Sequence, residues 1–301
     1  MIAVSICIPA YHARRYLGET LACVREQQFT DWELIVTEDG SDDGTAQLVR
    51  DFAASVAQPV RYERHEKNLG LPATRNTGIA SARAAWIALL DSDDLWMPEH
   101  LGALIETAKR QPTADLIHAG SILFDSDSGR ELERRAPSPE MVAMFPLSLF
   151  DRRYVIQPAS VMFKKSLWQQ IGGFNPAFRY VEDREMWLRC ARAGAVFAYT
   201  GRETCRYRKH QAALSAHAAE MAEASAEVFD QHLDWEALPT DLRHRLSAET
   251  WAAAGKLRQR RDPLTAARHF RRACARQWRC EWQVRAFAFG LLGKLRPRHA
   301  T

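Results

Sequence analysis

Apolar runs and segments with helical spacing follow one another along the first 110 residues of the chain. Residues 4–8 form an apolar run that ends at Pro9, which predicts a buried strand, and residues 14–27 carry apolar positions three and four apart, which predicts a helix. The same order then repeats, with strands expected at 33–37, 60–63 and 85–90 and helices at 45–56, 71–82 and 98–110. Such alternation predicts an α/β fold with a mostly parallel central sheet flanked by helices.

The pattern is less regular beyond residue 110. A strand pair is expected at 115–124 and a polar loop at 125–139, because the loop is rich in Asp, Ser, Gly and Pro. From about residue 214 the pattern is helical, so we predict a main domain over residues 1–215 and a helical C-terminal extension over residues 216–301. Further elements are expected at 159–163 (strand), 165–171, 183–193, 252–261, 263–274 and 278–295 (helices).

The composition is that of a folded globular protein, with 47% hydrophobic and 26% charged residues. No apolar stretch approaches the roughly 18 to 20 residues that span a bilayer, and the short apolar N-terminus lacks the basic region of a signal peptide. We therefore expect a cytoplasmic protein. The six cysteines include no C-x-x-C pair, so neither a zinc site nor disulfides are expected.

Charge is unevenly distributed along the sequence. Residues 251–301 hold 13 Lys and Arg against 2 Asp and Glu, whereas residues 1–250 hold 28 against 35. The net charges of these two segments are therefore +11 and −7. A basic helical segment fits either a solvated helix face or contact with an anionic membrane surface, an acidic partner or nucleic acid.

Two acidic motifs follow expected strands. Asp91, Asp93 and Asp94 come directly after the strand at 85–90, and Asp39 follows the strand at 33–37. Parallel strands of an open α/β sheet end at one edge, where ligands bind, so the two motifs should converge there. Clustered carboxylates repel one another unless a cation compensates, and Mg²⁺ or Mn²⁺ takes such ligands together with phosphate oxygens. A helix N-cap or an ordinary turn remains the structural alternative.

Six segments together make a specific resemblance. In order and spacing they resemble the motifs of family 2 glycosyltransferases, and the resemblance extends from residue 3 to about residue 215. It implies a GT-A fold, a nucleoside-diphosphate-sugar donor and inversion at the anomeric carbon of the sugar. The segments are Ile-Pro-Ala-Tyr at 8–11, Glu-Asp-Gly-Ser-Asp-Asp-Gly-Thr at 38–45, Ala-Thr-Arg-Asn-Thr-Gly at 73–78, Leu-Asp-Ser-Asp-Asp at 90–94, Ile-Gly-Gly-Phe at 171–174 and the segment from Glu182 to Arg189.

The resemblance assigns donor-binding roles to several positions. Pro9 and Tyr11 resemble nucleoside contacts, with the Tyr ring able to stack on the base, and Asp39 resembles the carboxylate that accepts a hydrogen bond from the base. Asp91 resembles the residue of the acidic motif that meets the ribose. Arg75 is placed either as a phosphate contact or as an ordinary helix residue, and the sequence leaves the two open.

Metal and catalytic roles follow in the same way. Asp93 resembles the carboxylate that meets the metal-bound diphosphate, and Asp183 resembles the general base. His210 follows the last strand expected from the resemblance, where a histidine can complete the metal or diphosphate site; a surface histidine among basic residues is the alternative. Two departures from the family pattern, His12 for Asn and Glu38 for Asp, remove no carboxylate that this chemistry needs.

The sequence therefore predicts an inverting, Mn²⁺- or Mg²⁺-dependent glycosyltransferase of surface polysaccharide or glycolipid assembly. We expect a UDP-sugar donor, a saccharide or lipid-linked glycan acceptor and no nucleic-acid partner. The alternative is a catalytically inactive sugar-nucleotide-binding or scaffold protein with the same fold. A dehydrogenase is excluded because no G-x-G-x-x-G segment is present.

The C-terminal extension predicts peripheral contact with the inner face of the membrane, or else packing on a protein surface. Basic helices with aromatic residues can lie in a membrane interface. The apolar residues expected to insert are Trp278, Trp282, Phe287, Phe289, Leu291 and Leu292.

Overall fold

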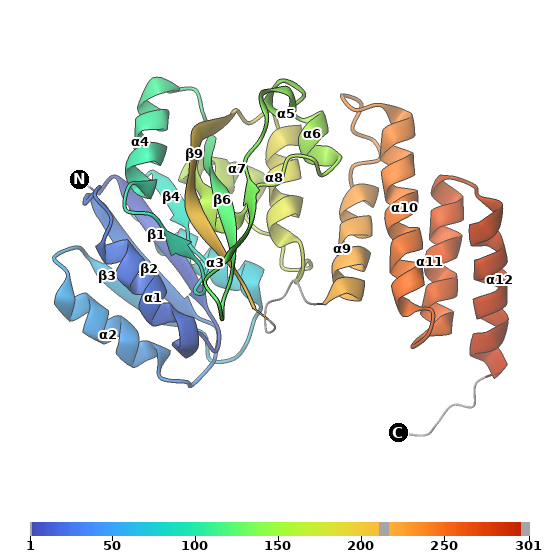
Figure 1. The fold of residues 1–301 in the computed structure, drawn as a ribbon, viewed down its shortest axis with the longest axis horizontal. Coiled ribbons are helices and arrows are strands. Elements are labelled where there is room, and N and C mark those ends of the chain that lie inside the picture. Colours follow the sequence, from blue (N-terminus) through green and yellow to red (C-terminus); the bar gives the residue numbers. More distant parts are fainter. Residues whose placement is uncertain (1, 211–216, 296–301) are drawn as a thin grey trace. The chain divides into compact units, whose positions relative to one another are not determined.

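The computed structural model describes residues 2–210 and 217–295. These residues form two compact units, the first within residues 1–211 and the second within residues 212–301. Figure 1 shows the sheet and its helices in the first unit and the helices of the second. The boundary predicted after residue 215 lies outside the described residues and stays a prediction.

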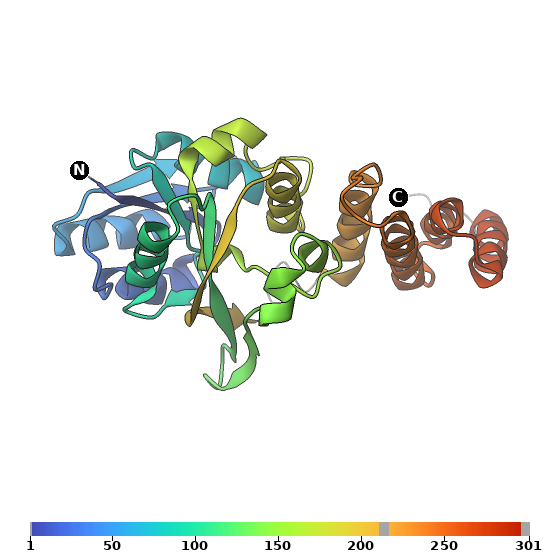
Figure 2. The ribbon, with the colours of Figure 1, turned by 90° about the horizontal axis from the view of Figure 1, so that it is seen from above.

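One mixed sheet forms the centre of the first unit (Figures 1 and 2). Its strands lie in the order β3-β2-β1-β4-β8-β6-β9-β5, with β7 paired to β6. β1 to β4 pair in parallel, β8 runs antiparallel to both of its neighbours, and β6 and β9 are parallel again. The predicted α/β class is confirmed. The strands are β1 Val4–Ala10, β2 Trp32–Glu38, β3 Val60–Arg64, β4 Trp86–Leu89, β5 Leu95–Trp96, β6 Leu116–Asp125, β7 Glu131–Arg135, β8 Val161–Lys164 and β9 Phe197–Lys209.

Helices cover both faces of this sheet. Apolar side chains of α1, α2 and α4 share one buried cluster with one face, while α3 packs on the other, where a Cβ on Gly78 would lie 3.7 Å from Ile35 and 3.8 Å from Cys7. α8 joins α3 on that second face, because Trp187 contacts Phe163 of β8. The helices are α1 Arg14–Arg25, α2 Thr45–Ser55, α3 Leu71–Ser81, α4 His100–Arg110, α5 Pro139–Ala143, α6 Leu147–Phe150, α7 Lys165–Ile171 and α8 Glu182–Arg192, with a 3₁₀ turn at Pro158–Ser160.

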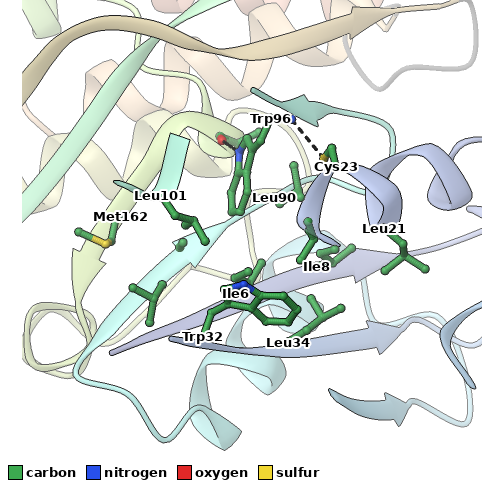
Figure 3. Close-up of a cluster of buried hydrophobic side chains, with 14 of the residues drawn as sticks. Ile6, Ile8, Leu21, Cys23, Trp32, Leu34, Leu90, Trp96, Leu101 and Met162 are labelled. Atoms are coloured by element: carbon green, nitrogen blue, oxygen red, sulfur yellow. Dashed lines mark hydrogen bonds between the residues drawn. The ribbon is translucent and has the colours of Figure 1, made fainter. Parts of the chain in front are cut away.

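Alternate residues of the central strands face opposite sides of the sheet and therefore pack against different helices. Ile6 and Ile8 of β1 point to one face and join Leu21 of α1 and Leu101 of α4 in the cluster drawn in Figure 3. Because alternate residues of a strand face opposite sides, Cys7 faces α3 instead. β1 is buried on both faces, which explains why its sequence is a continuous apolar run.

The prediction for residues 115–139 is wrong in detail. The expected strand pair at 115–124 is the single strand β6, and its partner β7 lies within the expected loop. β7 escaped prediction because its side chains are mostly charged and exposed, so no apolar pattern marks it. Its side chains form ion pairs, including Arg134 with Glu203 at 2.8 Å, as suits a strand at a solvated edge.

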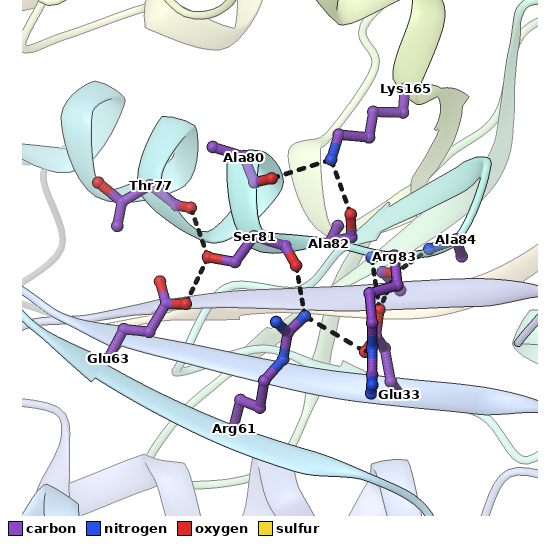
Figure 4. Close-up of polar contacts among 11 residues, drawn as sticks. Glu33, Arg61, Glu63, Thr77, Ala80, Ser81, Ala82, Arg83, Ala84 and Lys165 are labelled. Atoms are coloured by element: carbon purple, nitrogen blue, oxygen red, sulfur yellow. Dashed lines mark hydrogen bonds and ion pairs between the residues drawn. The ribbon is translucent and has the colours of Figure 1, made fainter.

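A buried carboxylate network supports the opposite end of the sheet from the expected ligand edge (Figure 4). Glu33, near the start of β2, accepts hydrogen bonds from the Ser5 hydroxyl (2.6 Å) and from the amide (2.7 Å) and Nε (2.8 Å) of Arg83. It also pairs with Arg61 at 3.2 Å. Burial by itself would raise the pKa of Glu33, but the hydrogen bonds from Ser5 and Arg83 lower it on balance. The network therefore stabilises the starts of the strands, and the edge where ligands are expected to bind lies at the other end of the sheet.

The second unit is helical and has its own core. Trp251, Phe270 and Trp282 form a cluster with several alanines. The helix expected at 252–261 is the second half of a longer helix, α10. No helix in residues 2–210 and 217–295 is long and apolar enough to cross a membrane. The helices are α9 Ala218–Asp230, α10 Thr240–Arg258, α11 Pro263–Arg276 and α12 Cys280–Leu295.

Part of the basic charge in the second unit is neutralised inside it. Arg258 pairs with Glu220 at 3.0 Å and with Glu223 at 2.8 Å, and Arg276 pairs with Asp230 at 3.1 Å. The acidic excess of the sequence lies mainly here, since residues 212–250 hold 8 Asp and Glu against 2 Lys and Arg, whereas residues 1–211 hold 27 against 26. The first unit is therefore close to neutral, contrary to the division of charge suggested by a cut at residue 250.

Candidate active site

The two acidic motifs lie at the same edge of the sheet, where the parallel strands end. Asp39 follows β2, and its amide donates to the Ala10 carbonyl at the end of β1 (2.8 Å). The Leu90 amide donates to the Cys7 carbonyl of β1 (3.1 Å), so the chain enters Asp91 from the other side of the same strand. β1 thus separates the motifs by one strand, which is close enough for both to contact one ligand.

The turn after β1 leaves an aromatic ring accessible. Pro9 is buried within β1, whereas Tyr11 is 51% exposed and free to stack on a flat base. His12 has a φ of +50°, in the left-handed region that His shares with Asn more readily than most residues do. The replacement of Asn by His is thereby explained. The His12 amide donates to the Ser41 hydroxyl (3.1 Å), which joins this turn to the motif after β2.

Asp39 organises the loop that follows β3. Its buried carboxylate accepts hydrogen bonds from the amides of Leu69 and Gly70, both at 2.8 Å, and contacts His65 Nδ1 at 2.8 Å. The neighbouring Gly40 must lack a side chain, because its φ is +74° and a Cβ there would lie 2.5 Å from the backbone of residue 67. The predicted hydrogen bond from Asp39 to a base stays a prediction.

Arg75 joins the acidic motif after β4 to the acidic pair at the start of α8. Its side chain is only 1% exposed, and its guanidinium donates to Asp91 Oδ1 (2.7 Å) and to Glu182 Oε1. The ring of Phe174 lies 5.3 Å from the guanidinium carbon. Both terminal amino groups are thus bound by carboxylates. Arg75 is more than an ordinary helix residue, and its contact with a phosphate stays a prediction.

The acidic pair that begins α8 has raised pKa values. Burial raises the pKa of Glu182 to about 7, with Arg75 opposing the rise and the charge of Asp183 adding to it. Burial also raises the pKa of Asp183, against the effect of Arg75. Val181, which precedes them, has a φ of +54°, a strained value for a β-branched residue. Strain and raised pKa values at one point are typical of a catalytic acid–base group.

Glu182 and Asp183 differ in what they bind. Glu182 is committed to Arg75, whereas Asp183 has no ion pair within residues 2–210 and 217–295 and is only partly buried. Asp183 is therefore the member of the pair whose carboxylate is available to a hydroxyl group.

The acidic turn after β4 is held from two sides. The Thr20 hydroxyl of α1 lies 3.0 Å from the carbonyls of both Ser92 and Asp94. From β9, Arg208 Nε donates to the Asp93 carbonyl (2.7 Å), and the Arg208 amide donates to Asp94 Oδ1 (2.8 Å). These contacts fix the backbone of the turn and so orient the Asp93 side chain.

Asp94 supports this turn instead of facing a ligand. It is completely buried, and burial raises its pKa well above the usual range, with the charges of Asp93 and Asp91 adding to the rise. Its Oδ2 has no hydrogen-bond partner in the described part of the chain. The cluster thus divides its roles, with Asp91 bound to Arg75, Asp94 buried and Asp93 directed outward.

Asp93 and His210 meet, as a shared metal or diphosphate site requires. The Asp93 Oδ2 atom lies 2.8 Å from His210 Nε2, and 32% of the Asp93 side chain is exposed. The Tyr16 ring packs 4.9 Å from the imidazole. The carboxylate suits Mn²⁺ or Mg²⁺ when phosphate and water oxygens supply other ligands, and the imidazole suits a transition metal such as Mn²⁺ better than Mg²⁺. Among the described residues no group of three or more His, Cys, Asp or Glu is arranged to hold an ion. Asp93 and His210 could therefore hold one only together with phosphate and water oxygens.

The glycine-containing turn at 171–174 is held by the side chain of Asn76. Asn76 Oδ1 accepts from Trp168 Nε1 (3.0 Å) and from the Phe174 amide (2.9 Å), and its Nδ2 donates to the Phe174 carbonyl (2.7 Å). A Cβ on Gly173 would lie 2.8 Å from Asn76 Oδ1. Asn76 therefore has a structural role, as does Arg189, which donates to the Gly173 carbonyl (2.7 Å).

Two residues of the site escaped sequence reasoning. Arg208 donates to Glu19 as well as to the acidic turn, and its guanidinium lies 4.7 Å from the Tyr16 ring. Its signal was present, since it lies two residues before His210. Thr20 was marked more weakly, as a polar residue beside Leu21 on the buried face of α1.

Comparison with known sequences agrees with this geometry. Residues 5–170 match the model of "Glycosyl transferase family 2". The putative glycosyltransferase EpsE of Bacillus subtilis (strain 168) is 26% identical over 188 residues, which cover 62% of this chain and 66% of EpsE. The putative teichuronic acid biosynthesis glycosyltransferase TuaG of the same strain is 27% identical over 202 residues, which cover 67% of this chain and 76% of TuaG. The chain thus matches about two thirds to three quarters of these relatives.

Comparison with solved structures supports the fold. S. aureus TarS, residues 1–349, superposes with a TM-score of 0.69 at 13% identity, over 96% of this chain and 89% of TarS. The mannosyltransferase PcManGT of Pyrobaculum calidifontis, solved with GDP-Man and Mn²⁺, gives a TM-score of 0.63 at 18% identity, over 97% of this chain and 86% of PcManGT. The fold is GT-A, and since the family match spans β1 through most of α7, the chain belongs to glycosyl transferase family 2.

Proposed function

We propose that this chain is a metal-dependent, inverting glycosyltransferase. It moves a sugar from a nucleoside-diphosphate sugar, such as a UDP-sugar, to a hydroxyl group of a saccharide or lipid-linked glycan in surface polysaccharide or glycolipid assembly. The observation that carries the proposal is the pairing of Asp93 with His210 at 2.8 Å at the sheet edge where Arg75 joins Asp91 to the Glu182–Asp183 pair. The similarity to TuaG, a putative glycosyltransferase of teichuronic acid biosynthesis, and the complexes of TarS with UDP-GlcNAc and of PcManGT with GDP-Man support it.

The donor side is the edge formed by the ends of β1, β2 and β4. There the exposed Tyr11 ring stacks on the base, and the carboxylate of Asp39 accepts a hydrogen bond from it. Asp91, oriented by Arg75, meets the ribose. Asp93 and His210 would hold Mn²⁺ or Mg²⁺, and such an ion stabilises the charge of the departing diphosphate.

The acceptor side is the start of α8. Asp183 accepts the proton of the acceptor hydroxyl, and its raised pKa makes it a better base than an exposed carboxylate would be. Glu182 stays bound to Arg75 and holds the start of the helix in place. Attack from the side opposite the diphosphate inverts the anomeric carbon in one displacement.

One experiment with three variants tests this proposal. Asp183→Asn should bind a nucleoside diphosphate as the wild type does, yet transfer sugar about 10² to 10⁴ times more slowly, because only the proton acceptor is lost. Asp93→Asn should lose the metal-dependent part of binding, and chelator should have the same effect on the wild type. Asp51→Asn, at an exposed position of α2, is the matched control. Binding is measured by calorimetry and turnover by a screen of nucleotide sugars.

Each arm has an outcome that contradicts the proposal. Transfer by Asp183→Asn at the wild-type rate would move the base elsewhere, with Glu182 the next candidate. Equal nucleotide affinity with and without metal would remove the ion from the mechanism. Donor binding without transfer or hydrolysis for every nucleotide sugar would favour the binding-protein alternative.

A further inference from the structure

The last helix of the second unit carries two apolar faces. The inner face of α12 belongs to the core of the unit, because Trp282 and Ala286 are each 3% exposed and Phe289 stacks on Phe270 of α11 with ring centroids 6.1 Å apart. Trp282 and Phe289 were predicted to insert into a membrane, and the structure corrects this, since both face the core. Any side chains of α12 that insert into a membrane must therefore lie on the side of the helix opposite Trp282 and Phe289.

We define the α12 outer face as Val284, Phe287, Leu291 and Leu292. All four side chains are exposed, with Phe287 at 76%. At 3.6 residues per turn, Val284, Phe287 and Leu291 form one stripe and Leu292 lies beside it. Trp278, just before the helix, is also exposed. A single exposed apolar residue needs no explanation, but a continuous stripe on a helix whose other side is already buried indicates a surface that another apolar phase covers.

Several cations of the last two helices have no carboxylate partner among the described residues. Arg268, Arg271, Arg272 and Arg285 form no ion pair within residues 2–210 and 217–295. Arg271 Nη2 lies 3.2 Å from the place of a Cβ on Gly290, on one flank of the stripe. Arg285, by contrast, donates to Gln259 (3.2 Å) and lies 5.8 Å from the ring of the buried Phe270.

The unpaired state of these arginines is selective. Arg276 and Arg279 of the same region do have partners, Asp230 at 3.1 Å and Glu249 at 3.3 Å. The acidic residues of α9 and α10 therefore neutralise the arginines that face them, whereas Arg271, on one flank of the α12 outer face, has no ion pair among the described residues.

We propose that the α12 outer face docks the second unit on an anionic lipid surface. Apolar side chains together with unpaired arginines match a bilayer interface, where the former enter the acyl region and the latter meet phosphate groups. A second copy of this chain fits less well, because it would bring the same unpaired arginines together. The proposal does not depend on catalysis, so it stands or fails separately from the proposed reaction.

Vesicle co-sedimentation of the full chain tests the proposal. The wild type should bind vesicles of phosphatidylcholine mixed with phosphatidylglycerol at low salt, bind less at high salt, and bind phosphatidylcholine alone weakly. Phe287→Gln with Leu291→Gln should lower the partition coefficient roughly tenfold or more, because the inserting side chains are lost. Leu257→Gln, an exposed apolar position of α10, is the matched control and should bind as the wild type does.

A charge arm separates electrostatic attraction from insertion. Arg268→Gln with Arg271→Gln should also lower the partition coefficient roughly tenfold and make binding less sensitive to salt. All of these positions are exposed, and circular dichroism should show unchanged helix content. Wild-type protein that stays in the supernatant with anionic vesicles at low salt overturns the proposal. So does unchanged vesicle binding by Phe287→Gln with Leu291→Gln, and a wild-type dimer that this variant dissociates would then identify the face as a contact between copies.

Discussion

Arg75 is the buried cation that interacts with the carboxylates Asp91, Glu182 and Asp183. Its one positive charge serves Asp91 and Glu182 directly and lowers the pKa of Asp183 as well. Such a buried cation cannot be removed without leaving carboxylates unpaired, at a cost of about 3 to 5 kcal/mol when one partner of a buried pair is lost. Its influence should therefore be visible in both stability and the pH dependence of the reaction.

Substitution of Arg75 should shift the pH profile of transfer. In Arg75→Gln the pKa values of Glu182 and Asp183 rise further, so the base is deprotonated only at higher pH and the acidic limb of kcat/KM moves upward in pH. Arg75→Lys keeps the charge but not the two-pronged geometry, so its acidic limb should stay near that of the wild type while kcat falls. Both expectations are tested by measuring steady-state kcat and kcat/KM of the wild type and the two variants across the acid pH range. Coincident profiles for Arg75→Gln and the wild type would show that Arg75 does not act on the base.

The sequence identified residue types better than their partners. Asp39, Asp93 and Asp183 were proposed because each lies within a recognisable motif, but the partners of Arg75 are 16 and 107 positions away. No local pattern marks a contact over such a separation. The sequence separated Asp91 from Asp93 only through the family resemblance and gave Asp94 no role of its own, whereas burial and the contact with Arg75 distinguish all three in the structure.

At the scale of elements, the sequence predicted best what is buried. β1, β2 and β4 have apolar runs because helices cover both faces of their part of the sheet. β7 is charged and was missed, because edge pairing depends on backbone hydrogen bonds to β6 rather than on burial of side chains. The cut at residue 250 that was used to compare charges falls inside an element, since α10 continues through it to Arg258.

The strand starts should depend on the Glu33 carboxylate. Glu33→Gln removes charge-assisted hydrogen bonds from a buried network and should lower the free energy of unfolding by about 2 kcal/mol at neutral pH. The folded-state pKa of Glu33 is depressed, so its contribution is present above the unfolded-state value and is lost as pH falls through the folded-state value. Urea unfolding at neutral and acidic pH measures this.

A matched variant controls for loss of charge alone. Glu131→Gln, on the solvated strand β7, also removes a carboxylate that pairs with an arginine, but about half of its side chain is exposed and little change is expected. If Glu33→Gln were equally destabilising at neutral pH and well below the usual carboxylate range, the carboxylate would not be the source of the effect.

At the scale of the whole molecule, the two units have separate cores. Phe270→Ala should destabilise the second unit by about 3 to 5 kcal/mol, because its ring is fully buried and lies 3.1 Å from the position of a Cβ on Gly255. Nucleoside-diphosphate binding should be unchanged, since the residues assigned to it lie in the first unit. Phe163→Ala, in β8, should destabilise the first unit and weaken nucleotide binding, and it should leave the stability of the second unit unchanged. Scanning calorimetry with and without nucleotide distinguishes the two, and a loss of nucleotide binding in Phe270→Ala would contradict independence.

The pairing of Asp93 with His210 also determines how much of the chain must be synthesised before the site can form. These two residues are 117 positions apart, and they meet only after β9 has paired with β6 from Leu116–Phe197 to Asp125–Lys209. Contacts that close such long loops cost chain entropy and cannot precede the synthesis of both partners. A ribosome-bound chain shorter than 210 residues therefore has no complete pair to offer a nucleotide. Under the proposed function, nucleotide binding would therefore stabilise only those chains that have completed the first unit.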